Sequence, residues 1–271
     1  MLRALAGPLR KFQSDRGTHL AAMVAYYALV SFVPILFLLL AALGLLERVD
    51  ESSFVVRELR RVLPGAPVEK IVAAVSAIQE NAATLGIVGG GFLLWSALGL
   101  FGALESAFNI VYGRPNRPFF RGKVLAIAFL TASLAASFAG LATTTIGWRA
   151  LAHAAPGIAG NGVVAFLVSL LGTATVVFVF LVAAYLLLTN ERQRLRDVLP
   201  GALVATLLLE ATFQVLPLFL ALSSESVALQ TLGSTALLLV WLYVMANAIV
   251  LGAEVNWYVR HRDEDGVVGL A

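Results

Sequence analysis

The chain has 271 residues, of which 60% are hydrophobic and only 13% are charged, and its mean hydropathy is +0.89. Soluble domains are typically about 45–50% apolar and about 25% charged, so this composition excludes a water-soluble globular protein. The absence of cysteine excludes disulfides and thiolate metal sites, and the three histidines lie in separate segments. We therefore expect no bound metal and no cofactor.

Long charge-poor stretches divide the chain into six predicted membrane-spanning segments. A helix needs about 20 apolar residues to cross a bilayer, and the pairing of backbone groups in lipid favours helices here. The predicted fold class is an all-α membrane protein, a bundle of six transmembrane helices with amphipathic helices between spans 1 and 2. Residues 20–259 form this domain, with spans at about 20–46, 84–112, 124–148, 163–188, 198–222 and 232–259.

Residues 47–81, between spans 1 and 2, are the one sizeable polar segment outside the termini. Pro64-Gly65 ends one predicted helix and Pro67 begins a second, which carries an apolar stripe at helical spacing. Two short amphipathic helices are therefore predicted on the extracytoplasmic side. Lying on the membrane surface and packing against the span ends both fit this pattern.

The distribution of basic residues predicts that both termini are cytoplasmic. Thirteen of the 19 basic residues fall in the N-terminal segment 1–19, the loops after spans 2 and 4, and the tail 260–271. Those in the loops are predicted to contact lipid head groups: Arg114, Arg117, Arg121, Lys123, Arg192, Arg194 and Arg196. We therefore expect membrane lipids, and no nucleic acid, as partners. Helix faces made of small residues would also suit the formation of a homo-oligomer.

Three glutamates interrupt the predicted spans: Glu105, Glu210 and Glu254. A charge inside a span costs from about 2.5 kcal/mol upward, so each is a candidate functional residue. Amides accompany them, and the candidate set for a cavity or a substrate or ion site is Glu210, Glu254, Asn256, Asn247, Gln214, Glu105 and Asn109. Pro217 can bend the helix that carries Glu210. Hydrogen bonds that merely hold helices together are the alternative for each residue.

Several motifs occur in an order that resembles the YihY/BrkB family of bacterial inner-membrane proteins. They are Ala25-Tyr-Tyr-Ala-Leu-Val-Ser-Phe-Val-Pro34, Leu94-Trp-Ser96 to Asn109-Ile-Val-Tyr-Gly113, Arg117-Pro-Phe-Phe-Arg121, Leu199-Pro-Gly-Ala202, Gly233-Ser, Trp241-Leu-Tyr243 and Gly252-Ala-Glu-Val-Asn256. The resemblance implies a six-helix protein of the inner (plasma) membrane. Glu210, Glu254 and Asn256 fit the family pattern. Some members were once labelled ribonuclease BN, a label that nothing in this sequence supports.

Two functions stay open at this stage. The first is a transporter or lipid-handling protein with a polar cavity that faces the cytoplasm and contains Glu210 and Glu254. The second is a non-transporting membrane scaffold or envelope-integrity factor. We do not expect an enzyme, because no Ser/His pair, paired intramembrane aspartates or His-Glu-x-x-His motif occurs.

Overall fold

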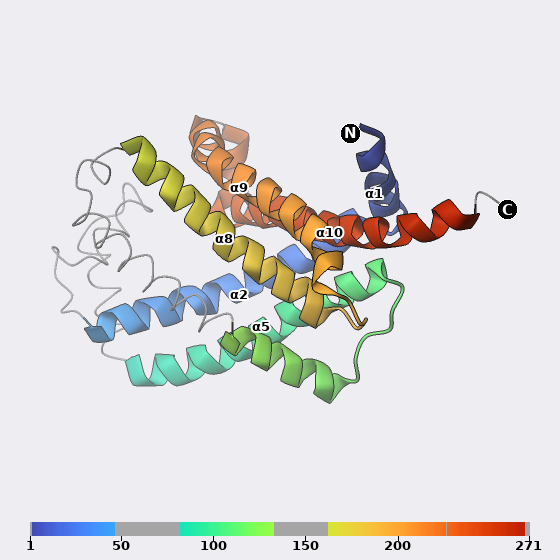
Figure 1. The fold of residues 1–271 in the computed structure, drawn as a ribbon. Coiled ribbons are helices and arrows are strands. Elements are labelled where there is room, and N and C mark those ends of the chain that lie inside the picture. The colour runs from blue at the N-terminus through green and yellow to red at the C-terminus, as the bar shows by residue number, and fades with distance from the viewer. Residues whose placement is uncertain (1, 47–81, 133–161, 226, 269–271) are drawn as a thin grey trace, which may run out of the picture. The chain divides into compact units, whose positions relative to one another are not determined.

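The computed structural model of the chain describes residues 2–46, 82–132, 162–225 and 227–268 (Figure 1). Within these ranges the regular structure is entirely helical. The helices are α1 (Leu2–Ser14), α2 (Gly17–Leu46), α5 (Ala82–Val111), an unlabelled helix over 119–132, α8 (Gly162–Leu188), α9 (Leu195–Glu225) and α10 (Val227–Val268). The predicted helical fold class is confirmed to this extent.

Four described helices are long and apolar enough to cross a membrane. These stretches are Leu94–Val111, Phe166–Leu188, Leu195–Val215 and Ala236–His261, which correspond to predicted spans 2, 4, 5 and 6. The first predicted span coincides with α2, in which a shorter apolar stretch is Gly17–Phe32. Predicted span 3 begins in the helix over 119–132, and the rest of it, like segment 47–81, lies outside the described residues. A total of six spans therefore stays a prediction.

Both ends of the predicted domain are more helical than expected. The N-terminal segment contains α1, and α10 continues as far as Val268 rather than ending at residue 259. The sequence signal for α1 is the spacing of Leu2, Leu5, Leu9 and Phe12, which places apolar residues along one side of a helix. No proline interrupts 260–268, and the polar end of α10 stays helical although it contains Asp265-Gly266, a pair typical of turns.

The described chain divides into two compact units. Unit 2 comprises Tyr27–Leu100, in which α2 and α5 approach each other where Gly99 lies against the ring of Tyr27. Unit 1 comprises Met1–Tyr26 and Phe101–Ala271, and it contains α1, α8, α9, α10 and the C-terminal part of α5. All of the polar contacts considered below lie within unit 1.

Local sequence signals explain how the helices of unit 1 end. Gly113 has a φ of 63°, and its N–H donates to the carbonyl of Ile110 while the N–H of Arg114 donates to that of Asn109. This is a Schellman motif, in which glycine takes the left-handed conformation that ends α5. At the start of α9, the Asp197 carboxylate accepts the N–H of Arg194 at 3.0 Å, as in one half of a capping box.

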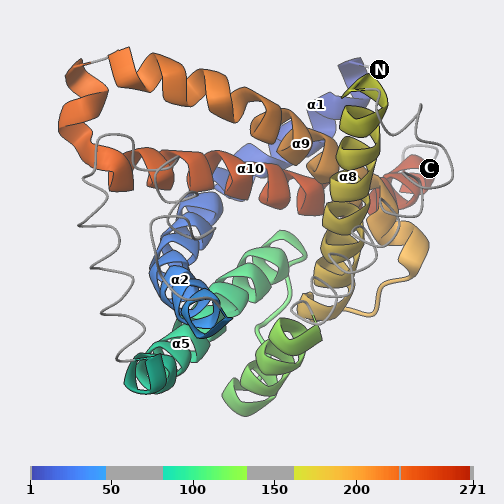
Figure 2. The same ribbon diagram turned by 90° about the vertical axis from the view of Figure 1, so that its left-hand side faces the viewer.

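Helices α9 and α10 lie side by side in both views (Figures 1 and 2). Their backbones approach at Gly201 and Gly252, where a Cβ atom on either glycine would collide with the carbonyl oxygen of the other. Tyr185 of α8 joins them there, because its hydroxyl donates to the carbonyl of Ile249 at 2.7 Å. Small residues thus allow the close helix contact that is typical of packing in membranes.

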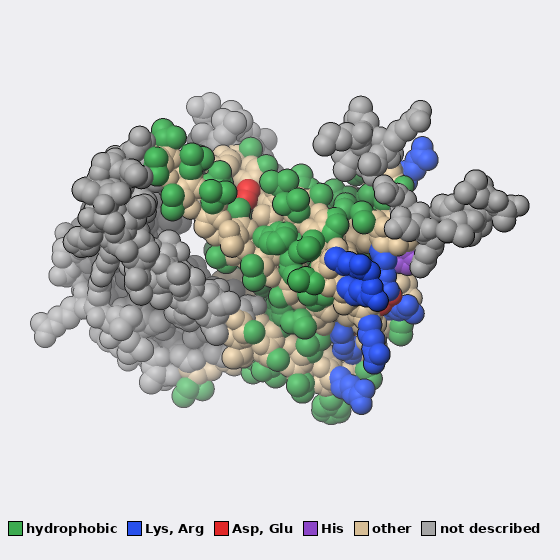
Figure 3. Space-filling model, in the orientation of Figure 1, with side chains coloured by type: hydrophobic (Ala, Val, Ile, Leu, Met, Phe, Trp, Pro, Cys, Tyr) green, Lys and Arg blue, Asp and Glu red, His purple; other side chains and the backbone are tan. Residues whose placement is uncertain are grey.

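Apolar side chains on α8 and α9 are widely exposed. Phe166, Leu171 and Val179 on α8 are more than half exposed, as are Leu203 and Leu207 on α9. Figure 3 shows hydrophobic side chains over these helices and Lys and Arg side chains gathered at one end of them. Exposed apolar surface of this extent is typical of helices that face lipid.

Candidate functional site

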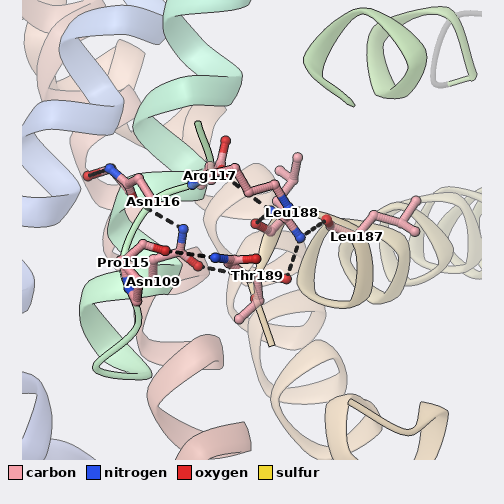
Figure 4. A network of polar contacts seen from close by, with 10 residues as sticks. Asn109, Pro115, Asn116, Arg117, Leu187, Leu188 and Thr189 are labelled. Atoms are coloured by element: carbon pink, nitrogen blue, oxygen red, sulfur yellow. Dashed lines mark hydrogen bonds and ion pairs between the residues drawn. The ribbon is translucent and has the colours of Figure 1, made fainter. Parts of the chain in front are cut away.

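Arg117 holds the C-terminal end of α8 to the loop that follows α5 (Figure 4). Its guanidinium donates to the carbonyls of Leu187 at 3.1 Å, Leu188 at 2.5 Å and Thr189 at 2.8 Å. The last carbonyls of a helix have no partner within it, and the helix dipole makes that end negative. Glu105 accepts from the Arg117 guanidinium and backbone N–H, each at 3.2 Å. The five-donor fork of arginine suits this site.

Asn109 joins the same two segments one turn further along α5. Its Nδ2 donates to Oδ1 of Asn116 at 3.0 Å, and its Oδ1 accepts the backbone N–H of Asn190 at 2.7 Å. Asn190 in turn donates from Nδ2 to the carbonyl of Pro115 at 2.9 Å. Glu105 and Asn109, which were candidates for a cavity, are therefore engaged with the protein's own loops. This arrangement corresponds to the structural alternative for both residues.

A second charged cluster surrounds Glu191, in the loop between α8 and α9. Its carboxylate lies 3.3 Å from Nη2 of Arg114 and 3.1 Å from Nη2 of Arg260. The hydrogen bond and the charge of Glu191 raise the pKa of the Arg114 guanidinium above its ordinary value. We call this end of unit 1 the basic end, because it carries Arg114, Arg117, Arg192, Arg194 and Arg260. Here α5, α8, α9 and α10 are joined through polar contacts.

Glu254 of α10 is fully buried, and its charge partner comes from α1. Its Oε2 lies 3.1 Å from Nζ of Lys11, without the geometry of a hydrogen bond. Its Oε1 is also buried and has no hydrogen-bond partner among the residues that the structure describes. An ionisable group left partly unsatisfied inside an apolar helix is costly, which makes Glu254 the candidate residue whose burial most needs explaining.

The other candidates on α9 and α10 are distributed over different environments. Asn256 is fully buried, and its Oδ1 accepts the N–H of Gly201 at 2.6 Å, while its Nδ2 has no partner within the described ranges. Glu210 is also buried, and its Oε1 has no partner in the described part of the chain. In contrast, Gln214 is exposed, and Asn247 donates to the carbonyl of Tyr243 one turn earlier in α10 at 2.7 Å. The structure does not bring these residues together into one cluster.

The residues predicted to contact head groups lie at or beside the basic end. Arg114, Arg121, Arg192, Arg194 and Arg196 are exposed, Lys123 is partly exposed, and Arg117 is turned inward to α8. Among the described residues, no group of three or more His, Asp or Glu side chains comes close enough to hold a metal ion.

Lys11 is the functional candidate that the sequence analysis missed. It was counted only as a topology signal, because nothing in the local sequence indicates that a residue near the N-terminus meets Glu254, 243 positions later. The available signal was the amphipathic spacing of α1, which predicts a helix with one side packed against the protein. In the structure α1 does pack on α10, and Gly7 lies against the ring of Tyr258.

These features define a helical membrane protein with several long apolar helices and buried carboxylates near a strongly basic end. The chain matches the family described as Virulence factor BrkB over residues 9–268, and it belongs to that family. The resemblance found in the sequence is thereby confirmed.

Relatives occur in several bacteria. The chain is 25% identical to a UPF0761 membrane protein of Aliivibrio salmonicida, over 92% of this chain and 81% of that protein. It is 27% identical to a UPF0761 membrane protein of Pseudoalteromonas translucida, over 89% of this chain and 81% of the relative. No solved structure matches the chain.

Proposed function

We propose that this protein is a multi-pass protein of the bacterial inner membrane, with both termini in the cytoplasm, that transports or otherwise handles a lipid or another amphipathic molecule. On this proposal it is not an enzyme, and its basic end is cytoplasmic. The buried polar site around Glu254 and Lys11 receives the head group of the molecule, and exposed arginines of the basic end contact the surrounding lipid phosphates.

The observation that carries the proposal is the state of Glu254. A fully buried carboxylate with an unpartnered oxygen lowers stability unless something offsets it, and polar groups kept in a membrane helix at such a cost generally serve function. The pairing of Glu254 with a lysine on a separate, short helix supports a site that opens and closes. Glu210, also buried and partly unpartnered, provides a second carboxylate in a neighbouring helix.

The test is lipid movement in reconstituted vesicles. The purified protein is placed in vesicles of phosphatidylglycerol and phosphatidylethanolamine that contain a trace of fluorescent phosphatidylethanolamine, and dithionite reports how much label reaches the outer leaflet. We expect Glu254→Gln and Glu210→Gln each to reduce the protein-dependent rate at least about tenfold, the loss that corresponds to about 1.4 kcal/mol. Thr212→Val, on the same helix as Glu210 and isosteric, serves as the matched control.

Equal rates for the wild type and both glutamine variants would refute the role of the carboxylates. A wild-type rate no higher than that of empty vesicles would favour the non-transporting scaffold for this class of lipid. The contacts of Arg117 and Asn109 hold the loops of the basic end in place, as such a scaffold would require.

A further inference from the structure

The ammonium group of Lys11 lies in a site formed by four groups from two helices, α5 and α10, and the turn after α1. Its Nζ donates to the carboxylate of Asp15 and, at 2.9 Å, to the backbone carbonyl of Val111. Glu254 Oε2 lies 3.1 Å away, and the centroid of the Trp257 ring lies 4.3 Å away. We call this site the ammonium cage.

The composition of the cage matches one chemical group, a primary ammonium. Such a group has three N–H donors and one carbon substituent. The cage offers three oxygens around the nitrogen and an aromatic face that attracts a cation. A quaternary ammonium has no N–H for the Val111 carbonyl.

The cage also contains unused binding capacity. The Glu254 side chain is fully buried, and its Oε1 has no partner although Oε2 faces the lysine. The Trp257 ring is held in place by His261, which stacks on it at 4.3 Å and whose Nδ1 lies 2.8 Å from the Trp257 carbonyl oxygen. The contacts that hold the Trp257 ring do not involve Lys11, so the ring is preorganised independently of that side chain.

Lys11 reaches the cage on a helix that is attached separately. A turn at Arg16, whose φ is 56°, separates α1 from α2, so α1 is not a continuation of a membrane span. A lysine tethered in this way acts as an internal ligand at high effective concentration, and an external ligand must displace it.

We propose that the ammonium cage binds the primary ammonium group of an amine or of an amine-bearing lipid head group, and that Lys11 occupies the cage when no such ligand is bound. This inference rests on the proposed function and names its substrate class. The neighbouring arginines of the basic end would suit a ligand that carries a phosphate as well as an ammonium, as a zwitterionic head group does.

Chemical rescue of a lysine-free variant tests the cage directly. Lys11→Ala leaves Glu254 unpaired, which should lower the melting temperature of the detergent-solubilised protein by roughly 5–10 °C. We expect methylammonium chloride to restore most of this loss in a saturable way. Potassium chloride and tetramethylammonium chloride at the same ionic strength should not restore it.

Two variants serve as controls. Arg10→Ala removes an exposed positive charge from the adjacent position of α1, and methylammonium should not change its melting temperature. Lys11→Ala combined with Glu254→Gln should lose the rescue, because the carboxylate that holds the ammonium is gone. If Lys11→Ala aggregates, Lys11→Met keeps the apolar stem and carries the same comparison with ammonium chloride as the probe.

Absence of rescue by methylammonium, or equal rescue by potassium, would overturn the proposal. The source of the ammonium is then distinguished with Lys11→Ala in nanodiscs. Stabilisation by phosphatidylethanolamine alone identifies a lipid ligand, and stabilisation by free ethanolamine as well identifies the ammonium group itself. Equal stabilisation by phosphatidylcholine would contradict selectivity for a primary ammonium.

The melting temperature does not depend on lipid movement, so the two proposals fail separately. Rescue without any protein-dependent lipid movement would support the proposed cage and refute the proposed transport function. Loss of movement in Glu254→Gln without rescue of Lys11→Ala would support the transport function and refute the cage.

Discussion

Arg117 shows how one side chain can satisfy several backbone groups at a helix end. It reaches three carbonyls at the end of α8 while Glu105 neutralises its charge. Because the pair is largely buried, removing Arg117 leaves both the Glu105 carboxylate and the three carbonyls short of donors.

We therefore expect Arg117→Gln to lower the free energy of unfolding by about 3 kcal/mol, in the range typical of a broken buried ion pair. Arg117→Lys should lose less, because it keeps the charge but not the planar fork of donors. Thermal unfolding in detergent gives the measurement. Arg121→Gln, which removes an exposed arginine four residues later, should change stability by under about 0.5 kcal/mol. Equal losses at 117 and 121 would contradict this role.

The burial of Glu105 and of Glu254 could be predicted from the sequence, but their partners could not. Both glutamates interrupt apolar runs, so their position within helices follows from the pattern. Glu105 meets Arg117 through the turn at Gly113, and Glu254 meets Lys11 across most of the chain length. Helical periodicity gives no information about such contacts, because they depend on how separate helices and loops pack.

At the scale of the helices, the contact of α9 with α10 depends on two missing side chains. A Cβ atom on Gly201 would clash with the carbonyl oxygen of Gly252, and a Cβ atom on Gly252 would clash with the carbonyl oxygen of Gly201. In the sequence Gly201 follows Pro200, and such a pair is typical of a helix boundary, whereas in the structure it lies inside α9. The local motif could not reveal this, because the requirement for glycine comes from a different helix.

Gly201→Ala and Gly252→Ala are each expected to destabilise the protein by about 1–3 kcal/mol, because the backbones must move apart to admit a methyl group. Gly172→Ala in α8 is the control. A Cβ there meets nothing within 4 Å, so the substitution should be neutral or stabilise the helix by about 0.5–1 kcal/mol. Melting temperatures of the three variants in one detergent make the comparison. A stable Gly201→Ala protein would show that the helices do not approach this closely.

For the whole molecule, the sequence predicted the membrane class and four of the long apolar helices that the structure describes, because a long run of apolar residues can be read directly from the sequence. The orientation relative to the membrane stays a prediction that rests on the excess of Lys and Arg on one side. The absence of cysteine makes this prediction simple to measure, because a single introduced cysteine carries all of the thiol signal.

We expect Arg194→Cys, in the loop before α9, to react with a membrane-impermeant maleimide only after the inner membrane is permeabilised. Arg149→Cys, in the loop predicted on the opposite side, should react in intact spheroplasts. The cysteine-free parent gives the background. Labelling of Arg194→Cys in intact spheroplasts would reverse the predicted orientation.

The Arg117 contact also has a consequence for the order of assembly. Ribosomes make α5 and the loop at 113–118 about 70 residues before the carbonyls at the end of α8, as the separation of Arg117 from Leu187 shows. Synthesis proceeds from the N-terminus, so Arg117 and Glu105 can pair before α8 leaves the translocon. When α8 enters the bilayer, the donors for the carbonyls of its last turn are already in place. These carbonyls therefore do not stay unpaired until a later helix is made.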